Sequence, residues 1–183
     1  MAVYPGSFDP VTLGHLDIIE RVSNIFDKVI VAVSLNPAKN TLFSVRERVE
    51  MLKEVLEPYP NVEVDFYQGL TIDYSVYRDV SVIIRGLRVI SDFEYELKIA
   101  LINKKLTSHV ETLFLMTKAE YMPISSTSVK EVALFGGSLK NLVPPLVEVK
   151  LKEKSKRLNR KKPEIHQDNQ LSNILTMPNN LIL

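Results

Sequence analysis

Short apolar runs alternate along this chain with longer segments in which apolar residues recur every three or four positions. The short runs cover 1–4, 28–34, 61–66, 80–84 and 111–116. Several are apolar at nearly every residue, as strands buried on both faces of a sheet are. Because parallel strands need long crossover connections, usually helical, this alternation predicts an α/β fold. We expect a doubly wound five-stranded parallel sheet with helices on both faces.

The segments between these runs carry helical signals. Two combine a hydroxyl residue with a glutamate three positions later, the pattern of a capping box: Ser44 with Glu47, and Ser91 with Glu94. Apolar stripes at spacings of three or four mark the helices themselves. The stripes comprise Leu16, Ile19, Val22 and Phe26; Val45, Val49, Leu52 and Leu56; and Phe93, Leu97 and Leu101. Each stripe is expected to cover the sheet.

Composition excludes several classes of protein. The chain has no cysteine, which excludes a disulfide scaffold, a thiolate zinc site and a cysteine nucleophile. It has no apolar run near the roughly 18 residues of a membrane-spanning helix, so no membrane association is expected. The first ten residues lack the basic start and long apolar stretch of a secretory signal. We therefore expect a cytoplasmic protein.

The net charge of +1 conceals a division of the chain. Residues 1–149 carry 15 basic and 19 acidic side chains, a net charge of −4, whereas residues 150–162 carry eight basic and one acidic, a net charge of +7. Residues 163–183 are polar and carry a net charge of −2. We expect a domain over 1–153 and a basic, then polar, C-terminal extension over 154–183. Disorder and docking on a neighbouring surface are both compatible with the composition of that extension.

The loop after the first predicted strand has the composition of a phosphate site. It contains Gly6 and Ser7, and it leads into a helix that begins near Gly14 and carries His15 in its first turn. Free N–H groups and the helix dipole favour a phosphate at such a helix start. A neutral imidazole there can donate one hydrogen bond to a phosphoryl oxygen. The alternative is a turn rich in glycine and proline with an incidental surface histidine.

Other loops carry groups suited to polyanions. Arg85 and Arg88 flank Gly86 just after a predicted strand, and guanidinium groups form paired hydrogen bonds with phosphate oxygens. Lys39 follows the second strand, and four hydroxyl residues at 125–128 precede a helix. Taken one at a time, these features equally suit surface charges and a helix cap.

The segment Tyr4–His15, YPGSFDPVTLGH, resembles the T-x-G-H signature of the nucleotidyltransferase α/β-phosphodiesterase superfamily, with Thr12 where many members have a histidine. Within that superfamily it is similar to the phosphopantetheine adenylyltransferases. Two further motifs fit that family in order and spacing: RGLR followed by DFEYE over 85–96, and ISST over 124–127, where Pro123 replaces the commoner phenylalanine. The resemblance covers about residues 1–150 and implies a Rossmann-like fold.

The resemblance implies transfer of the adenylyl group of ATP to 4′-phosphopantetheine, giving dephospho-coenzyme A and pyrophosphate. The attacking group is already an anionic phosphate, so no general base is needed, and catalysis rests on positioning and charge stabilisation. Mg²⁺ held mainly by the ATP phosphates is expected. The family also implies a homohexamer and feedback inhibition by coenzyme A.

The resemblance assigns roles to individual residues. The expected catalytic residues are Ser7, His15, Lys39 and Arg88. Ser7, Lys39, Thr71 and Arg85 are expected to bind phosphopantetheine. The residues expected to bind ATP are Ser7, Phe8, His15, Gly86, Leu87, Arg88, Glu96, Tyr121, Met122, Pro123, Ile124, Ser125, Ser126 and Thr127.

Two other functions compete with this one. The first is a related nucleotidyltransferase with another phosphate acceptor, such as nicotinamide mononucleotide; the RGLR and DFEYE motifs favour phosphopantetheine. The second is nucleic-acid binding through the basic run at 150–162, driven by counter-ion release. That run has no interleaved aromatic residues and the body is acidic, so we expect no nucleic-acid partner.

Overall fold

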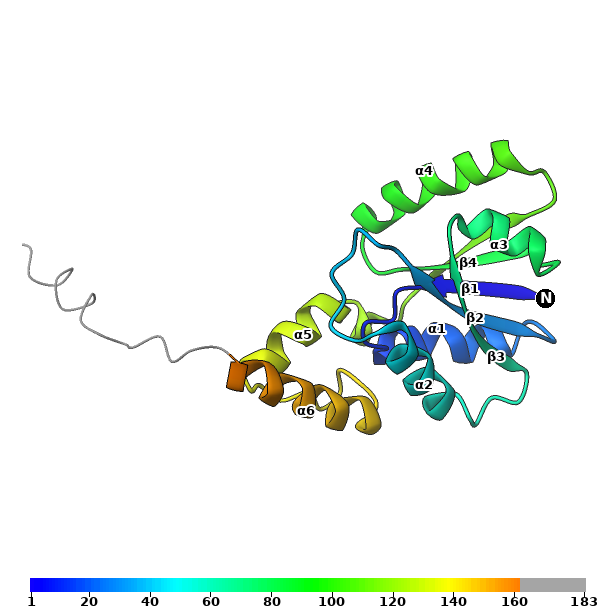
Figure 1. Ribbon diagram of the computed structural model, residues 1–183. Helices are drawn as coiled ribbons and strands as arrows, with labels where there is room; N and C mark the ends of the chain where they lie inside the picture. The colour runs from blue at the N-terminus through cyan, green and yellow to red at the C-terminus, as the bar shows by residue number, and fades with distance from the viewer. Residues whose placement is uncertain (162–183) are drawn as a thin grey trace, which may run out of the picture.

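The computed structural model describes residues 1–161, with side chains through residue 158, and places five parallel strands in one sheet (Figure 1). The strands are β1 (Ala2–Gly6), β2 (Val29–Leu35), β3 (Val62–Gln68), β4 (Val82–Leu87) and β5 (Glu111–Met116). They lie in the order β3-β2-β1-β4-β5, so the order reverses between β1 and β4. In sheets of this kind, ligands bind beyond the carboxyl ends of the strands at that reversal. The predicted five-stranded parallel sheet is confirmed.

Helices cover both faces of the sheet, as predicted. One face carries α1 (Leu13–Ser23), α2 (Val45–Val55), α5 (Ser126–Leu134) and α6 (Pro145–Lys161), and the other carries α3 (Thr71–Tyr77) and α4 (Ile90–Leu106) (Figure 1). Strand β2 shows why its sequence is apolar throughout. Val31 packs into the core cluster that includes α1 and α2 residues, while its neighbours Ile30 and Ala32 pack with α3. Successive strand side chains point to opposite faces, so both faces must be apolar.

The capping box predicted at the start of α2 is confirmed. Ser44 Oγ accepts the Glu47 N–H at 3.2 Å, and a Glu47 carboxylate oxygen accepts the Ser44 N–H at 2.7 Å. The box predicted at Ser91 is wrong, because the N-cap of α4 is Val89, two residues earlier, and Val89 has no side-chain hydrogen bond. Ser91 therefore lies inside the helix.

The apolar stripe predicted for α4 does not pack as expected. Phe93, Leu97 and Leu101 are 40%, 36% and 58% exposed, and no residue of α4 is buried. Ion pairs attach the first half of α4 to the end of β4 instead: Asp92 pairs with Arg88, and Glu96 pairs with Arg85. The helical spacing was right, but residues 1–161 leave this stripe partly exposed.

The basic run at 150–162 begins within α6. Lys150 pairs with Glu54 at 3.3 Å, Lys152 with Glu148 at 2.6 Å, and Lys154 with Glu47 at 2.8 Å. The predicted boundary at 153/154 falls inside this helix, and the predicted extension beyond residue 161 lies outside the described residues. Within residues 1–161, no helix is long and apolar enough to cross a membrane.

Candidate active site

Two adjoining cavities lie at the carboxyl ends of the strands, near the reversal of strand order. The first, about 490 Å³, is bounded by the loop after β1, the starts of α1 and α5, and the end of β4. The second, about 660 Å³, lies toward β3 and α4 and has apolar walls that include Leu35, Leu70 and Ile102. Residues shared by both cavities include Ser7, Lys39, Arg85 and Glu96. A ligand could therefore span both.

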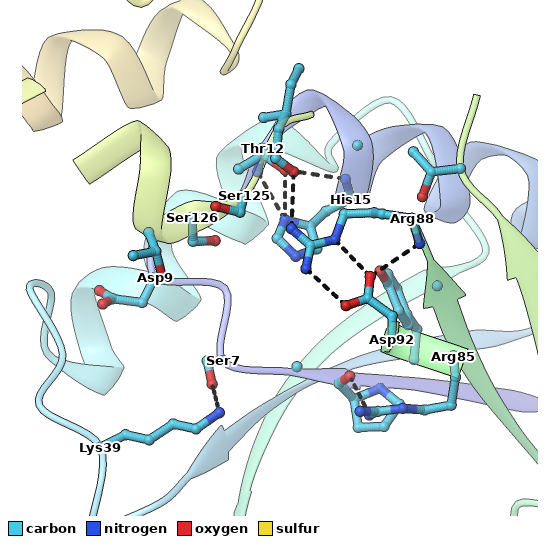
Figure 2. A pocket seen from close by; sticks show the side chains of 18 of the residues that line it. Ser7, Asp9, Thr12, His15, Lys39, Arg85, Arg88, Asp92, Ser125 and Ser126 are labelled. Carbon is cyan, nitrogen blue, oxygen red and sulfur yellow. Dashed lines mark hydrogen bonds and ion pairs between the residues drawn. The ribbon is translucent and has the colours of Figure 1, made fainter. Parts of the chain in front are cut away.

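His15 occupies the first turn of α1 and lines the first cavity (Figure 2). Its Nδ1 accepts the backbone N–H of Thr12 at 3.0 Å, and the Thr12 hydroxyl lies 2.9 Å from the same nitrogen. A backbone N–H can only donate, so Nδ1 carries no proton and Nε2 carries it. Burial, assisted by the positive charge of Arg88, lowers the pKa of His15 to about 4. At neutral pH this histidine is an uncharged Nε2–H donor.

The lowered pKa predicts how His15 titrates. In the unliganded chain, imidazole ¹⁵N NMR should show the Nε2–H tautomer from pH 8 down to about pH 5, with protonation centred near 4. The folded pKa lies below the unfolded value of about 6.5, so this group's contribution to stability is complete above pH 6.5. That contribution is lost as the pH falls toward 4. The signal is assigned by its disappearance in His15→Asn, and titration centred near 6.5 would contradict the argument.

Thr12, named above only as the threonine of the T-x-G-H signature, is a positioning residue for His15. It is the N-cap of α1, 1% exposed, and its Oγ1 accepts the His15 N–H at 3.4 Å. Together with the bond from its backbone to Nδ1, this forms a capping box in which a histidine replaces the usual glutamate. The pattern T-x-x-H before an apolar helix was the available signal.

Thr12→Val should remove the hydroxyl that caps α1 and contacts the His15 ring, while keeping the side-chain volume. We expect about 1 kcal/mol lower unfolding free energy, the usual cost of losing an N-cap. Because the hydrogen bond from the Thr12 N–H to His15 Nδ1 remains, kcat should fall only about tenfold, less than the loss expected when a positioned donor is removed altogether. Urea denaturation and steady-state kinetics measure both, with Thr12→Ser as the control that retains the hydroxyl. A valine variant with unchanged stability and kcat would contradict this role.

The turn after β1 is fixed by packing and by Asp9. The Phe8 ring is buried and meets the His15 ring edge-on, with centroids 5.1 Å apart. A side chain at Gly6 would place its Cβ 2.9 Å from that ring, so glycine is required there. The Asp9 carboxylate accepts the Leu42 and Phe43 N–H groups at 2.9 Å, and Lys130 Nζ donates to it at 2.8 Å. Asp9 thereby ties the turn to the loop that carries Lys39.

The two arginines of the β4 end both pair with carboxylates of α4. Arg85 forms a bidentate pair with Glu96 and also donates to the carbonyl of Pro5 at 3.3 Å. Arg88 pairs with Asp92 at 3.1 Å and donates to the Ile124 carbonyl at 3.4 Å (Figure 2). Glu96, expected on the ATP side, therefore contacts the arginine expected on the phosphopantetheine side. A bound phosphate would have to compete with these carboxylates.

The start of α5 and Lys39 complete the rim of the first cavity. Ser125 caps α5 by accepting the Ser128 N–H at 3.0 Å, and Ser126 donates to the Pro10 carbonyl at 2.8 Å. Their hydroxyls thus orient the helix start, whose backbone N–H groups favour an anion. Lys39 Nζ lies 3.4 Å from Ser7 Oγ, across the junction of the two cavities (Figure 2).

The structure gathers most of the predicted site residues. The first cavity is lined by Ser7, His15, Lys39, Arg85, Gly86, Arg88, Glu96, Ile124, Ser125, Ser126 and Thr127, and the second by Thr71. Five predicted residues line neither cavity: Phe8, Leu87, Tyr121, Met122 and Pro123. The Phe8 and Leu87 side chains are buried in the core. Lining residues that the sequence did not reveal include Asp9, Thr12, Asn40, Thr41 and Lys130.

Comparison with known proteins identifies the family. A model described as cytidylyltransferase-like matches residues 3–132. Over 154 residues the chain is 61% identical to a phosphopantetheine adenylyltransferase from Carboxydothermus hydrogenoformans, an alignment that covers 84% of this chain and 95% of that protein. The chain belongs to the phosphopantetheine adenylyltransferase family.

Further relatives agree with this assignment. A phosphopantetheine adenylyltransferase from Caldanaerobacter subterraneus subsp. tengcongensis is 58% identical over 157 residues, covering 86% of this chain and 98% of the relative. The fold matches a solved structure from Vibrio parahaemolyticus that is provisionally assigned as a nicotinate-nucleotide adenylyltransferase. That match has a TM-score of 0.64 at 18% identity and covers 85% of this chain and 94% of the other. At this identity it supports the fold alone.

The phosphopantetheine adenylyltransferase chain supplies no cage for a divalent metal in its described part. Within residues 1–161, no group of three or more histidine, aspartate or glutamate side chains could hold an ion. The carboxylates that line the first cavity are all engaged, Asp9 and Asp92 by N–H groups and cations and Glu96 by Arg85. The residues present therefore do not form a metal site of their own.

Proposed function

We propose that the chain transfers the adenylyl group of ATP to 4′-phosphopantetheine, giving dephospho-coenzyme A and pyrophosphate in coenzyme A biosynthesis. One observation carries the proposal: a polar cavity under His15 adjoins a larger cavity with apolar walls, and Ser7, Lys39 and Arg85 line both. The first suits the phosphates of ATP, and the second suits the extended pantetheine arm. The acceptor phosphate then lies at the junction. The names of relatives that are 55–61% identical support the same reaction.

The chemistry follows from the charges at that junction. An oxygen of the acceptor phosphate attacks the α-phosphorus, a new P–O bond forms, and the bond from the α-phosphorus to the bridging oxygen breaks, releasing pyrophosphate. His15 Nε2–H donates to a non-bridging α-phosphate oxygen as charge grows there. A neutral donor keeps its proton during this step, so no proton has to be moved.

The cations divide between the two substrates. Lys39 and Arg85 hold the acceptor phosphate, and Arg88 with the start of α5 holds the phosphates of ATP. Substrate binding exchanges the α4 carboxylates Asp92 and Glu96 for phosphate oxygens on the two arginines. Guanidinium groups suit this exchange because carboxylate and phosphate accept the same paired hydrogen bonds.

The remaining features of the proposal extend from the family. Mg²⁺ bound to the ATP phosphates supplies charge neutralisation for the leaving pyrophosphate. Residues 1–153 act as the enzyme domain and residues 154–183 as its extension. The enzyme works in the cytoplasm as a hexamer, and coenzyme A inhibits it by competing for the acceptor site. Analytical ultracentrifugation and inhibition kinetics test these last two points.

An acceptor panel tests the proposed function. Purified chain, ATP and Mg²⁺ are mixed with 4′-phosphopantetheine, nicotinamide mononucleotide, nicotinate mononucleotide or glycerol 3-phosphate, and pyrophosphate release is followed. We expect turnover with 4′-phosphopantetheine and at least a hundredfold lower kcat/KM with the others. Turnover with one of the others and none with 4′-phosphopantetheine would overturn the choice of acceptor while retaining the reaction type.

A further inference from the structure

Arg48 is a buried arginine outside both cavities. It lies in the first turn of α2, after the N-cap Ser44, and is 3% exposed. Burying a guanidinium removes its hydration, which is costly unless hydrogen bonds replace it. That burial lowers the pKa of Arg48, and the negative charge of Asp9 opposes the shift. The buried guanidinium of Arg48 must therefore be stabilised by the groups that it contacts.

Arg48 donates a hydrogen bond to a backbone carbonyl group. Its Nη1 donates to the Ser7 carbonyl oxygen at 2.6 Å, a short charge-assisted hydrogen bond. Its Nε is buried without a partner among the described residues. The guanidinium therefore contacts a peptide group of the active-site turn where a buried arginine would ordinarily meet a carboxylate.

That contact sets the direction of one peptide plane. Ser7 lines both cavities, whereas Arg48 lines neither. The Ser7 carbonyl therefore points toward the Arg48 guanidinium on α2. In a planar trans peptide the carbonyl and the next N–H point in opposite directions, so the Phe8 N–H points away from Arg48.

The backbone of this turn needs such support. Phe8 has φ of 45°, in the left-handed region that a residue with a side chain occupies at a cost of about 1 kcal/mol or more. Its ring is held between Tyr4 and His15, with centroids 5.6 and 5.1 Å away. The ring contacts fix the side chain, and the Arg48 bond fixes the preceding peptide. Together they fix the conformation of the turn at Phe8.

We propose that Arg48 is a positioning residue for adenylyl transfer, which keeps the Ser7–Phe8 peptide turned so that the Phe8 N–H donates to a phosphate oxygen in the first cavity. This rests on the proposed function, because the phosphate belongs to ATP or to its acceptor. Arg48 acts through the peptide and does not touch the substrate. Two uncharged hydrogen-bond donors, the Phe8 N–H and the His15 Nε2–H, are then already oriented before the transition state forms.

Arg48→Met tests the proposal, with Arg46→Met as its matched control on the same helix. Arg46 is 89% exposed and pairs with Glu50, so its loss should leave kcat unchanged. Arg48→Met should lower kcat about 10- to 100-fold. Removing an oriented donor altogether lowers kcat about 10²–10³-fold, and this variant only loosens the peptide that carries the donor. Arg48→Met leaves the Ser7 carbonyl without its donor, so a modest fall in Tm is expected as well, which thermal unfolding measures alongside kcat. Equal kcat in the two variants would overturn the proposal.

The Phe8 amide gives a direct readout that a merely structural role would not move. In ¹H–¹⁵N spectra, ATP with Mg²⁺ should shift the Phe8 signal in the wild type and in Arg46→Met, and by less than half as much in Arg48→Met. A full shift in Arg48→Met would overturn the proposal. Should that variant fail to fold, Arg48→Lys decides, with a reduced shift and intermediate kcat supporting the role and wild-type values overturning it.

This readout separates the two proposals. It needs ATP alone and no acceptor. A wild-type chain that shows the Phe8 shift, but adenylylates no 4′-phosphopantetheine, would overturn the proposed function and leave the role of Arg48 in place. If the wild type is active and Arg48→Met is equally active, the proposed function stands and the role of Arg48 is overturned.

Discussion

Replacing His15 with alanine is expected to lower kcat about 10²–10³-fold, the usual cost of removing one positioned donor to a developing oxyanion. The imidazole is uncharged at neutral pH, because burial and Arg88 lower its pKa to about 4. Its loss therefore removes a directed donor and no net charge. KM for ATP should change less than threefold, and the ATP dissociation constant measured by calorimetry should change as little.

Two further variants sharpen this expectation. His15→Gln can present an amide N–H and should recover about tenfold of the lost rate, well below the full effect of the donor. His109→Ala replaces a histidine that lines neither cavity and should match the wild type. Equal kcat in His15→Ala and His109→Ala would remove His15 from the mechanism. A large rise in the ATP dissociation constant with unchanged kcat would turn it into a binding residue.

Replacing Arg88 with alanine is expected to have the second large effect, a fall in kcat/KM for ATP of about 10²–10³-fold. Arg88 is placed between α4 and the start of α5, where it donates to Asp92 and to the Ile124 carbonyl. Its guanidinium can orient the ATP phosphates with two hydrogen bonds, which a lysine ammonium cannot reproduce. Arg88→Lys should therefore recover only part of the activity, and Arg46→Ala serves as the exposed control.

Arg88→Ala also has a consequence at His15. The positive charge of Arg88 contributes to the lowered His15 pKa, although burial is the larger cause. The pKa of His15 should therefore rise above 4 in the variant, which imidazole ¹⁵N NMR measures. Asp92→Asn frees Arg88 from its carboxylate and should tighten ATP binding. Unchanged ATP kinetics in Arg88→Ala would contradict the proposed phosphate contact.

The sequence anticipated the sheet because several short runs are apolar at nearly every residue and because these runs alternate with amphipathic helical segments. The prediction that His15 lies in the first turn of a helix after a strand end is confirmed, since Gly14 before it marks the helix start. Sequence reasoning failed at Ser91, where an apparent capping box lies one residue inside α4. In the first turn of the helix, Asp92 accepts the Arg88 N–H and pairs with its guanidinium, a contact between residues four apart that the sequence analysis did not consider.

Arg48 shows a deeper limit of sequence reasoning. It lies three residues after Val45 and four before Leu52, on the apolar side of its helix, but no motif marks it. The structure buries it against the Ser7 carbonyl, a contact between residues 41 positions apart. The positioning role of Thr12 was missed for a different reason, because its partner in the capping box is a histidine in place of glutamate. Long-range packing decides the first case, and local chemistry with an unusual partner decides the second.

The most direct test of the reaction follows one atom. 4′-Phosphopantetheine labelled with ¹⁸O at its non-bridging phosphate oxygens is converted with unlabelled ATP, and the products are examined by ³¹P NMR. Attack of the acceptor phosphate on the α-phosphorus predicts ¹⁸O in the oxygen that bridges the two phosphorus atoms of dephospho-coenzyme A, and unlabelled pyrophosphate. Label in a diphosphate released from ATP, or a product without a labelled bridge, would contradict adenylyl transfer at this site.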